Sequence, residues 1–86
     1  MALDSKTWRE HPFQVNQSYE AARTFTGVGG TFFAGKTYRL VHVGHSHYDG
    51  CSIFTFEPVE SSSKLAWWWP DDDPASACES HFKVGR

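Results

Sequence analysis

The sequence has few cysteines and no long hydrophobic run, and each absence excludes a class of protein. Cys51 and Cys78 are too few for a disulfide framework and form no C-x-x-C pair, so we expect reduced, partly buried thiols in a cytoplasmic protein. No apolar stretch approaches the roughly 20 residues that a membrane-spanning helix needs. Residues 1–10 contain an acid at Asp4 and no apolar stretch behind it, so we expect no signal peptide. The chain is therefore predicted to have no membrane partner.

Basic residues are too few for a surface that binds nucleic acid. The 86 residues include 8 Lys and Arg against 10 Asp and Glu, which gives a formal net charge of −2. Nucleic-acid binding usually depends on a basic surface, so we expect no nucleic-acid partner. The length is that of one domain, assigned to residues 1–86, in which we expect residues 1–15 to be a flexible or loosely packed N-terminal segment.

Leucine and isoleucine are scarce, and aromatic residues take their place as core formers. Four Trp, three Tyr and seven Phe make up 16% of the chain, and hydrophobic residues make up 40%. This composition is sufficient for a folded domain. The predicted core residues are Leu40, Val41, Ile53, Phe54, Phe56 and Leu65.

Three segments show the alternation that is typical of β-strands. They cover residues 37–43, 52–59 and 64–69 and are rich in β-branched and aromatic side chains, which favour a pleated, half-buried surface. Residues 44–50 join the first two segments and end in Asp49-Gly50, a hairpin signal because Gly accepts a positive φ.

Helices are expected before and after these strands along the chain. Apolar residues at helical spacing predict a helix over residues 17–24, which the glycines of residues 27–30 would end. A short helical turn is expected within residues 4–10. Asp73-Pro74 is a favourable start for a helix over residues 75–83. The predicted fold class is α+β: a small antiparallel meander, curled as an SH3-like partly open barrel, with short N- and C-terminal helices.

Residues 30–37, GTFFAGKT, match the phosphate-loop pattern G-x-x-x-x-G-K-[ST]. In a true phosphate loop the backbone wraps a phosphate between a strand and a following helix. Here the residues that follow predict a strand, and those that precede show no convincing one. We therefore interpret the match as a turn in which Gly35 takes a positive φ, Lys36 is solvated and Thr37 opens a strand.

His45, His47 and Asp49 form an H-x-H-x-D pattern that resembles the metal-binding motif of metallo-β-lactamase-type hydrolases. Imidazole and carboxylate groups are suitable zinc ligands, but that family has a much longer αββα domain. The alternative interpretation is an exposed hairpin tip in which Asp49 bonds to backbone N–H groups. Cys51 and Cys78 are interpreted as small core residues. We expect no cofactor and no enzymatic activity, with zinc at His45, His47 and Asp49 as the alternative.

The run Trp67-Trp68-Trp69 presents two rings to one side of a strand and one ring to the other. Tryptophan is enriched at binding hot spots, so we name Trp67, Trp68, Trp69 and Tyr48 as partner-binding candidates. The competing interpretation places Trp67 and Trp69 in the core and covers Trp68 with an end helix or the N-terminal segment.

One extended pattern is similar to that of small bacterial single-domain proteins of about this length. It consists of F-x-x-G-x-x-Y in residues 32–38, then GHSHYDG, F-T-F, and a Trp followed by Asp-Asp-x-Pro. The resemblance covers roughly residues 24–82 and implies a single α+β domain, without an activity or site residues.

A small, acidic, aromatic-rich domain is typical of proteins that act by binding. We predict a non-enzymatic domain that binds a protein partner, as an inhibitor, immunity protein or accessory subunit. The alternatives are carbohydrate or small-ligand recognition on the aromatic surface, and a zinc-dependent function at the His loop. A homodimer is compatible with this composition.

Overall fold

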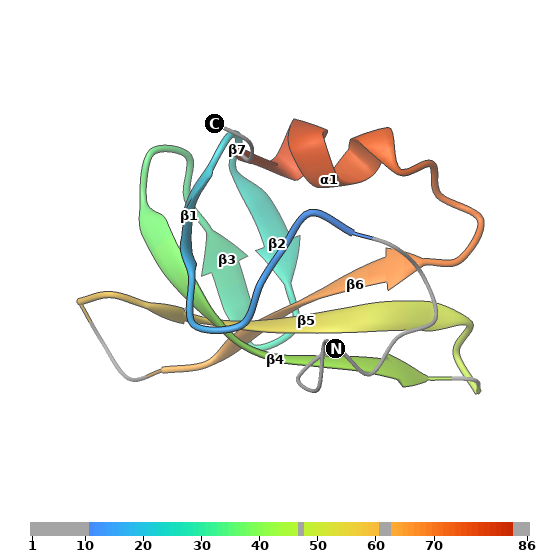
Figure 1. Ribbon diagram of the computed structural model, residues 1–86. Helices are drawn as coiled ribbons and strands as arrows, with labels where there is room; N and C mark the ends of the chain where they lie inside the picture. The colour runs from blue at the N-terminus through green and yellow to red at the C-terminus, as the bar shows by residue number, and fades with distance from the viewer. Residues whose placement is uncertain (1–10, 47, 61–62, 84–86) are drawn as a thin grey trace.

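The computed structural model describes residues 11–46, 48–60 and 63–83. Its elements are β1 (Ser18–Ala21), β2 (Phe25–Gly27), β3 (Gly30–Phe32), β4 (Thr37–Ser46), β5 (Cys51–Pro58), β6 (Leu65–Pro70), α1 (Ser76–His81) and β7 (Phe82–Lys83). Five strands form an antiparallel sheet in the order β6-β5-β4-β1-β7, and β2 and β3 form a separate hairpin (Figure 1). The described part of the chain is therefore a small β-rich fold with one short helix, and its sheet does not close into a barrel.

Strands β4, β5 and β6 confirm the three strands predicted from the sequence. A bulge in β4 shifts the pairing with β5 between Leu40 and His42. Because an extra residue reverses the alternation of side chains, Leu40 and Val43 are buried whereas His42 is exposed. Strand β4 continues to Ser46, so the connection to β5 is shorter than the seven residues expected.

The helix predicted over residues 17–24 is wrong. Residues 18–21 form β1, which pairs with β4 on one side and with β7 on the other. The helical spacing of apolar residues is overridden because β1 satisfies its backbone groups in the sheet. The helical turn predicted within residues 4–10 lies outside the described residues.

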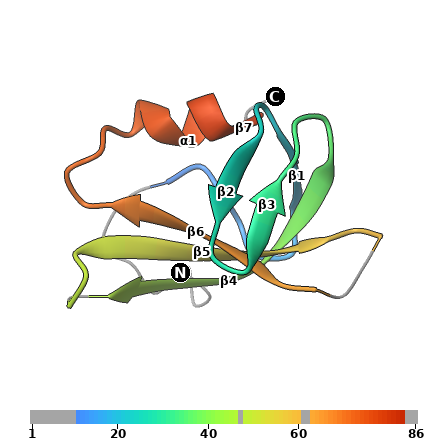
Figure 2. The same ribbon diagram turned by 180° about the vertical axis from the view of Figure 1, so that it is seen from behind.

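The glycine-rich segment 27–30 forms the tip of a hairpin. Strands β2 and β3 pair from Phe25–Phe32 to Gly27–Gly30. At the tip, Val28 and Ala66 exchange both of their backbone hydrogen bonds, each 2.8 Å long. The hairpin is thereby fastened to the edge of β6 (Figure 2).

The C-terminal helix is confirmed in place but is shorter than predicted. Its N-cap residue is Ala75, not the expected Asp73, and the cap has no side-chain hydrogen bond. The chain then becomes extended at Phe82 and pairs with β1 as β7. No helix among the described residues is long and apolar enough to cross a membrane.

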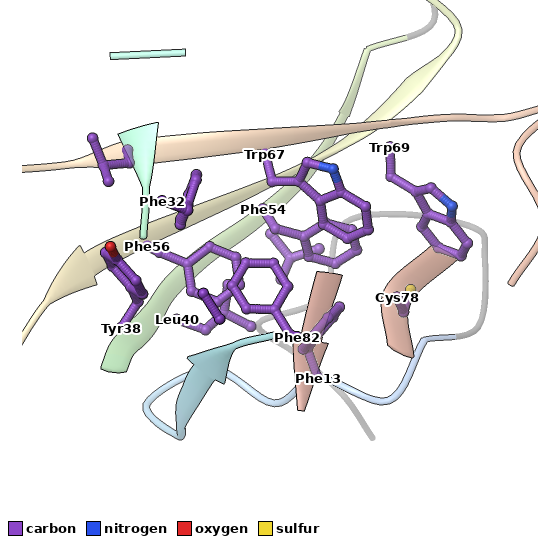
Figure 3. Close-up of a cluster of buried hydrophobic side chains, with 13 residues drawn as sticks. Phe13, Phe32, Tyr38, Leu40, Phe54, Phe56, Trp67, Trp69, Cys78 and Phe82 are labelled. Carbon is purple, nitrogen blue, oxygen red and sulfur yellow. The ribbon is translucent and has the colours of Figure 1, made fainter. Parts of the chain in front are cut away.

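Aromatic rings form the core between the strands and α1 (Figure 3). Phe56 stacks on Phe82 with ring centroids 4.5 Å apart, and Phe54 stacks on Trp67 at 5.6 Å. Phe13, which belongs to the segment expected to pack loosely, is also buried in this cluster. The predicted core residues that are confirmed are Leu40, Phe54, Phe56 and Leu65.

The prediction that Val41 and Ile53 belong to the core is wrong, because both side chains are partly exposed. Val41 lies at the bulge of β4. Ile53 lies between Ser52 and Phe54, both fully buried, so the period of two along a strand turns it to the outer face.

Candidate functional site

The residues that match the phosphate-loop pattern form a strand, a turn and a second strand. Gly35 has a φ of +87°, and the backbone N–H of Lys36 donates to the carbonyl of Phe33 at 3.0 Å. The Lys36 ammonium lies 3.1 Å from Glu60 on the surface. Strand β4 begins directly after this turn, where a phosphate loop would lead into a helix. The turn interpretation of this segment is confirmed.

The histidine pattern is divided between the inside and the surface. The His45 side chain is only 5% exposed, and its Nε2 lies 3.1 Å from both carboxylate oxygens of Asp71. Asp71 also donates its backbone N–H to the carbonyl of Gly50 at 2.8 Å. The turn after β6 is thus fastened to the β4–β5 hairpin, and the expectation of His45 at an exposed tip is wrong. The cause is the bulge in β4, which turns His45 to the core side.

Asp49 is exposed and bonds within its own turn. Its carboxylate accepts a hydrogen bond from the Ser46 hydroxyl at 2.8 Å. The backbone N–H of Asp49 in turn donates to Oγ of Ser46 at 3.1 Å. His47 lies outside the described residues. Within residues 11–46, 48–60 and 63–83, no group of three or more His, Cys, Asp or Glu side chains is placed to hold a metal ion.

Both cysteines are buried and free, as expected of small core residues. Cys51 lies between Ser46 of β4 and Pro70 of β6. Burial raises the pKa of the Cys51 thiol, and the negative charges of Asp49 and Asp71 raise it further. The thiolate is the reactive form of cysteine, so this environment disfavours nucleophilic chemistry at Cys51.

The tryptophans divide as the alternation of β6 requires. Trp67 and Trp69 point into the core and are 6% and 0% exposed (Figure 3). The Trp69 indole N–H donates to the carbonyl of Pro74 at 3.3 Å. Both therefore lie in the core, the position that the competing interpretation of the tryptophan run gives them. Trp68 points the other way and is 40% exposed, and Tyr48 in the hairpin turn is fully exposed.

Trp68 lies in a patch on the side of β4, β5 and β6 that faces away from the core. We call this patch the Trp68 face, and its residues are His42, Gly44, Ile53, Thr55, Ala66 and Trp68. Their Cα partners form two rows across the three strands, one of which ends at Trp68 and the other at Ala66. The His42 ring lies beside Gly44, since a Cβ built on Gly44 would be 3.5 Å from His42 Cε1.

Charged side chains lie at the margin of the Trp68 face and not within it. Beyond the two rows, Arg39 pairs with Glu57 at 2.9 Å and Lys64 approaches the same carboxylate at 3.5 Å. Within the face, His42 is the one ionisable side chain. The face thus combines apolar side chains with the polar His42 and Thr55 and has its charged groups at the margin, as in protein interfaces.

Sequence reasoning identified Trp68 and missed the residues around it. The alternation in residues 52–56 indicated that Ile53 and Thr55 share a face, but not that this face is the outer one. The position of His42 depends on the bulge in β4, for which the sequence has no clear signal.

No protein-family model matches the chain, and searches of curated proteins and of solved structures find no match to it.

Proposed function

We propose that this protein is a small non-enzymatic binding domain whose Trp68 face docks on a protein partner. The observation that carries the proposal is the 40% exposure of a tryptophan on the open face of a three-stranded sheet. Exposed apolar surface of this kind is a feature of interaction sites. Tryptophan is also among the residues most enriched at interface hot spots.

The rigidity of the sheet supports this proposal. Ile53 and Thr55 belong to the central strand β5, which is hydrogen-bonded on both sides, so the face has little conformational freedom to lose on binding. Burial of the Trp68 ring and the neighbouring Ile53 side chain would supply the apolar centre of an interface. An inhibitor, immunity or accessory role is consistent with such a face.

We further propose that the five strands form an SH3-like, partly open barrel. The strand order is consistent with this, since the first strand pairs with the last and the other three form a meander. The two free cysteines are consistent with a reducing, cytoplasmic setting.

The test compares the wild-type chain with Trp68→Ala and with Phe33→Ala as a matched control. Phe33 is 51% exposed and precedes β4, at the opposite end of that strand from the β4–β5 turn. A protein retained from an extract of the source cells would be purified and its affinity measured by calorimetry. We expect Trp68→Ala to weaken binding by about 2 kcal/mol, a typical hot-spot loss, and Phe33→Ala to have no effect.

Thermal unfolding of both variants serves as the control for folding, and both should resemble the wild type because the substituted rings are exposed. Equal affinity of wild type and Trp68→Ala would contradict the proposal. The second candidate is carbohydrate recognition, which the polar His42 and Thr55 in the neighbouring row of the Trp68 face favour. Glycan binding that Trp68→Ala abolishes, without any protein partner, would support that candidate instead.

A further inference from the structure

The end of the sheet next to Trp68 is acidic. Asp49 lies in the β4–β5 turn, and Asp71 and Asp72 lie in the turn after β6. The hydrogen bond from Asp71 N–H to the Gly50 carbonyl, 2.8 Å long, holds the two turns together. Burial raises the pKa of the Cys51 thiol most, and the charges of Asp49 and Asp71 raise it further. Both carboxylates therefore lie near the Cys51 thiol. We call Asp49, Asp71 and Asp72 the acidic end.

Among the described residues, the lysines and the arginine that form ion pairs lie away from the acidic end. Each of them pairs with a glutamate, in the pairs Lys36–Glu60, Arg39–Glu57, Lys64–Glu57 and Lys83–Glu20. At the acidic end, the Asp71 carboxylate lies 3.1 Å from Nε2 of His45. The charges of the described surface are therefore unevenly distributed, with carboxylates concentrated at one end of the sheet.

The acidic end and the Trp68 ring belong to one continuous surface. Trp68 and Pro70 lie two residues apart on β6, so they share one face of the sheet, and both are exposed. Asp71 and the exposed Asp72 follow Pro70 directly. Successive rows on one face are about 7 Å apart, two residues along a strand. The exposed Tyr48 lies in the same turn as Asp49. A partner that covers Trp68 therefore also meets the field of the acidic end.

We infer that the partner presents a basic protein segment with an arginine that stacks on Trp68. This inference rests on the proposed function and names the chemistry of the partner. A guanidinium group is planar and weakly hydrated, so it stacks on an indole ring while its N–H groups bond to carboxylates. A lysine ammonium keeps the charge but lacks the planar stacking surface.

The test uses two synthetic peptides, octa-arginine and octa-lysine, titrated into the full chain. Affinities are measured by calorimetry. In the wild type, the NMR signal of the Trp68 indole N–H, which Trp68→Phe identifies by its loss, reports whether a peptide reaches this ring. We expect octa-arginine to bind at least about threefold more tightly than octa-lysine and to shift this signal. Trp68→Ala should remove that preference, and the double change Asp49→Asn with Asp72→Asn should weaken both peptides about tenfold or more.

The control variants are Phe33→Ala and Glu60→Gln, a second exposed ring and a second exposed carboxylate away from the acidic end. Neither should change the affinity of either peptide. Equal affinities of the two peptides in the wild type, or an arginine preference that survives Trp68→Ala, would overturn the inference and leave only a general attraction of cations.

The purified partner separates this inference from the proposed function. If its affinity falls with Trp68→Ala but is unchanged by the two aspartate substitutions, the face binds a protein and the inference of a basic segment is wrong. If its affinity falls with both sets of variants, both stand. If neither set has an effect, both fail.

Discussion

At the scale of single residues, the environment of Cys51 depends on parts of the chain that the fold brings together. Asp49 precedes it by two positions, whereas Asp71 comes from the turn after β6 and is held there by His45. Both carboxylates oppose the formation of a second negative charge at the thiol. The Cys51 thiol is therefore stabilised in its protonated form, which is the less reactive one.

Alkylation rates should show this directly. At neutral pH we expect iodoacetamide to modify Cys51 in the folded protein more than about tenfold more slowly than in the urea-unfolded chain, since access and thiolate fraction are both reduced. Peptide mass spectrometry distinguishes Cys51 from Cys78. A rate equal to that of the unfolded chain would contradict the assigned environment.

The same shift has a consequence for stability. The pKa of the Cys51 thiol is higher in the folded than in the unfolded chain. The contribution of this thiol to the free energy of unfolding is therefore complete below the ordinary thiol pKa. Between the ordinary and the raised value, the unfolded chain binds fewer protons, so this contribution declines as the pH rises. Cys51→Ala should flatten the decline in melting temperature over that alkaline range.

At the scale of elements, the β2–β3 hairpin is positioned by the absence of a side chain. A Cβ on Gly27 would overlap the Ala66 carbonyl oxygen and would lie 2.7 Å from Cε1 of Phe32. Glycine at this position lets the hairpin backbone approach β6 closely enough for Val28 and Ala66 to exchange their two hydrogen bonds.

Gly27→Ala should therefore destabilise the protein by about 1–3 kcal/mol, the usual range for overpacking against a backbone group. The matched control is Gly35→Asn, because Gly35 has a positive φ with open space around it, and Asn tolerates this backbone conformation. Urea unfolding of the two variants measures the difference. A control that loses as much stability as Gly27→Ala would show that the close approach is not the cause.

The elements also show which parts of the fold local sequence can specify. Strands β5 and β6 carry their own alternation and end markers, and both were predicted to within about a residue or two. Strand β1 has four residues, too few for a period, and it is a strand because β4 and β7 pair with it. Long-range pairing of this kind has no signal in the segment itself.

The candidate site also has one feature that the sequence can predict and others that it cannot. Trp68 could be named from the sequence because alternation separates it from Trp67 and Trp69. The His45–Asp71 pair could not, since its members come from two turns that meet only in the folded sheet. The bulge in β4 further decides that His45 points inward and His42 outward.

At the scale of the whole molecule, stability depends on one cluster of rings to which nearly every element contributes. Phe82 of β7 contacts Phe13, Phe25, Phe32, Phe56 and Trp67 with centroid separations between 4.5 and 5.7 Å. Loss of one ring therefore affects packing in several elements at once, and we expect unfolding to be a single cooperative transition.

Phe56→Ala should cost about 3–5 kcal/mol, as is usual when a fully buried ring is removed. That is a large fraction of the stability of a small domain. Phe33→Ala removes the same group from the surface and should change the free energy of unfolding by less than about 0.5 kcal/mol. Thermal and urea unfolding of the two variants test this contrast, and a similar loss in both would refute the assigned core.

The pairing of β1 with β7 also determines when the protein can fold during its synthesis. The first strand of the sheet finds its edge partner in residues 82 and 83, and Phe82 completes the ring cluster. A nascent chain that ends before these residues can form the β4–β5–β6 meander, but it lacks both the last strand and this central ring. Folding of the complete domain therefore follows the emergence of residues 82 and 83 from the ribosome.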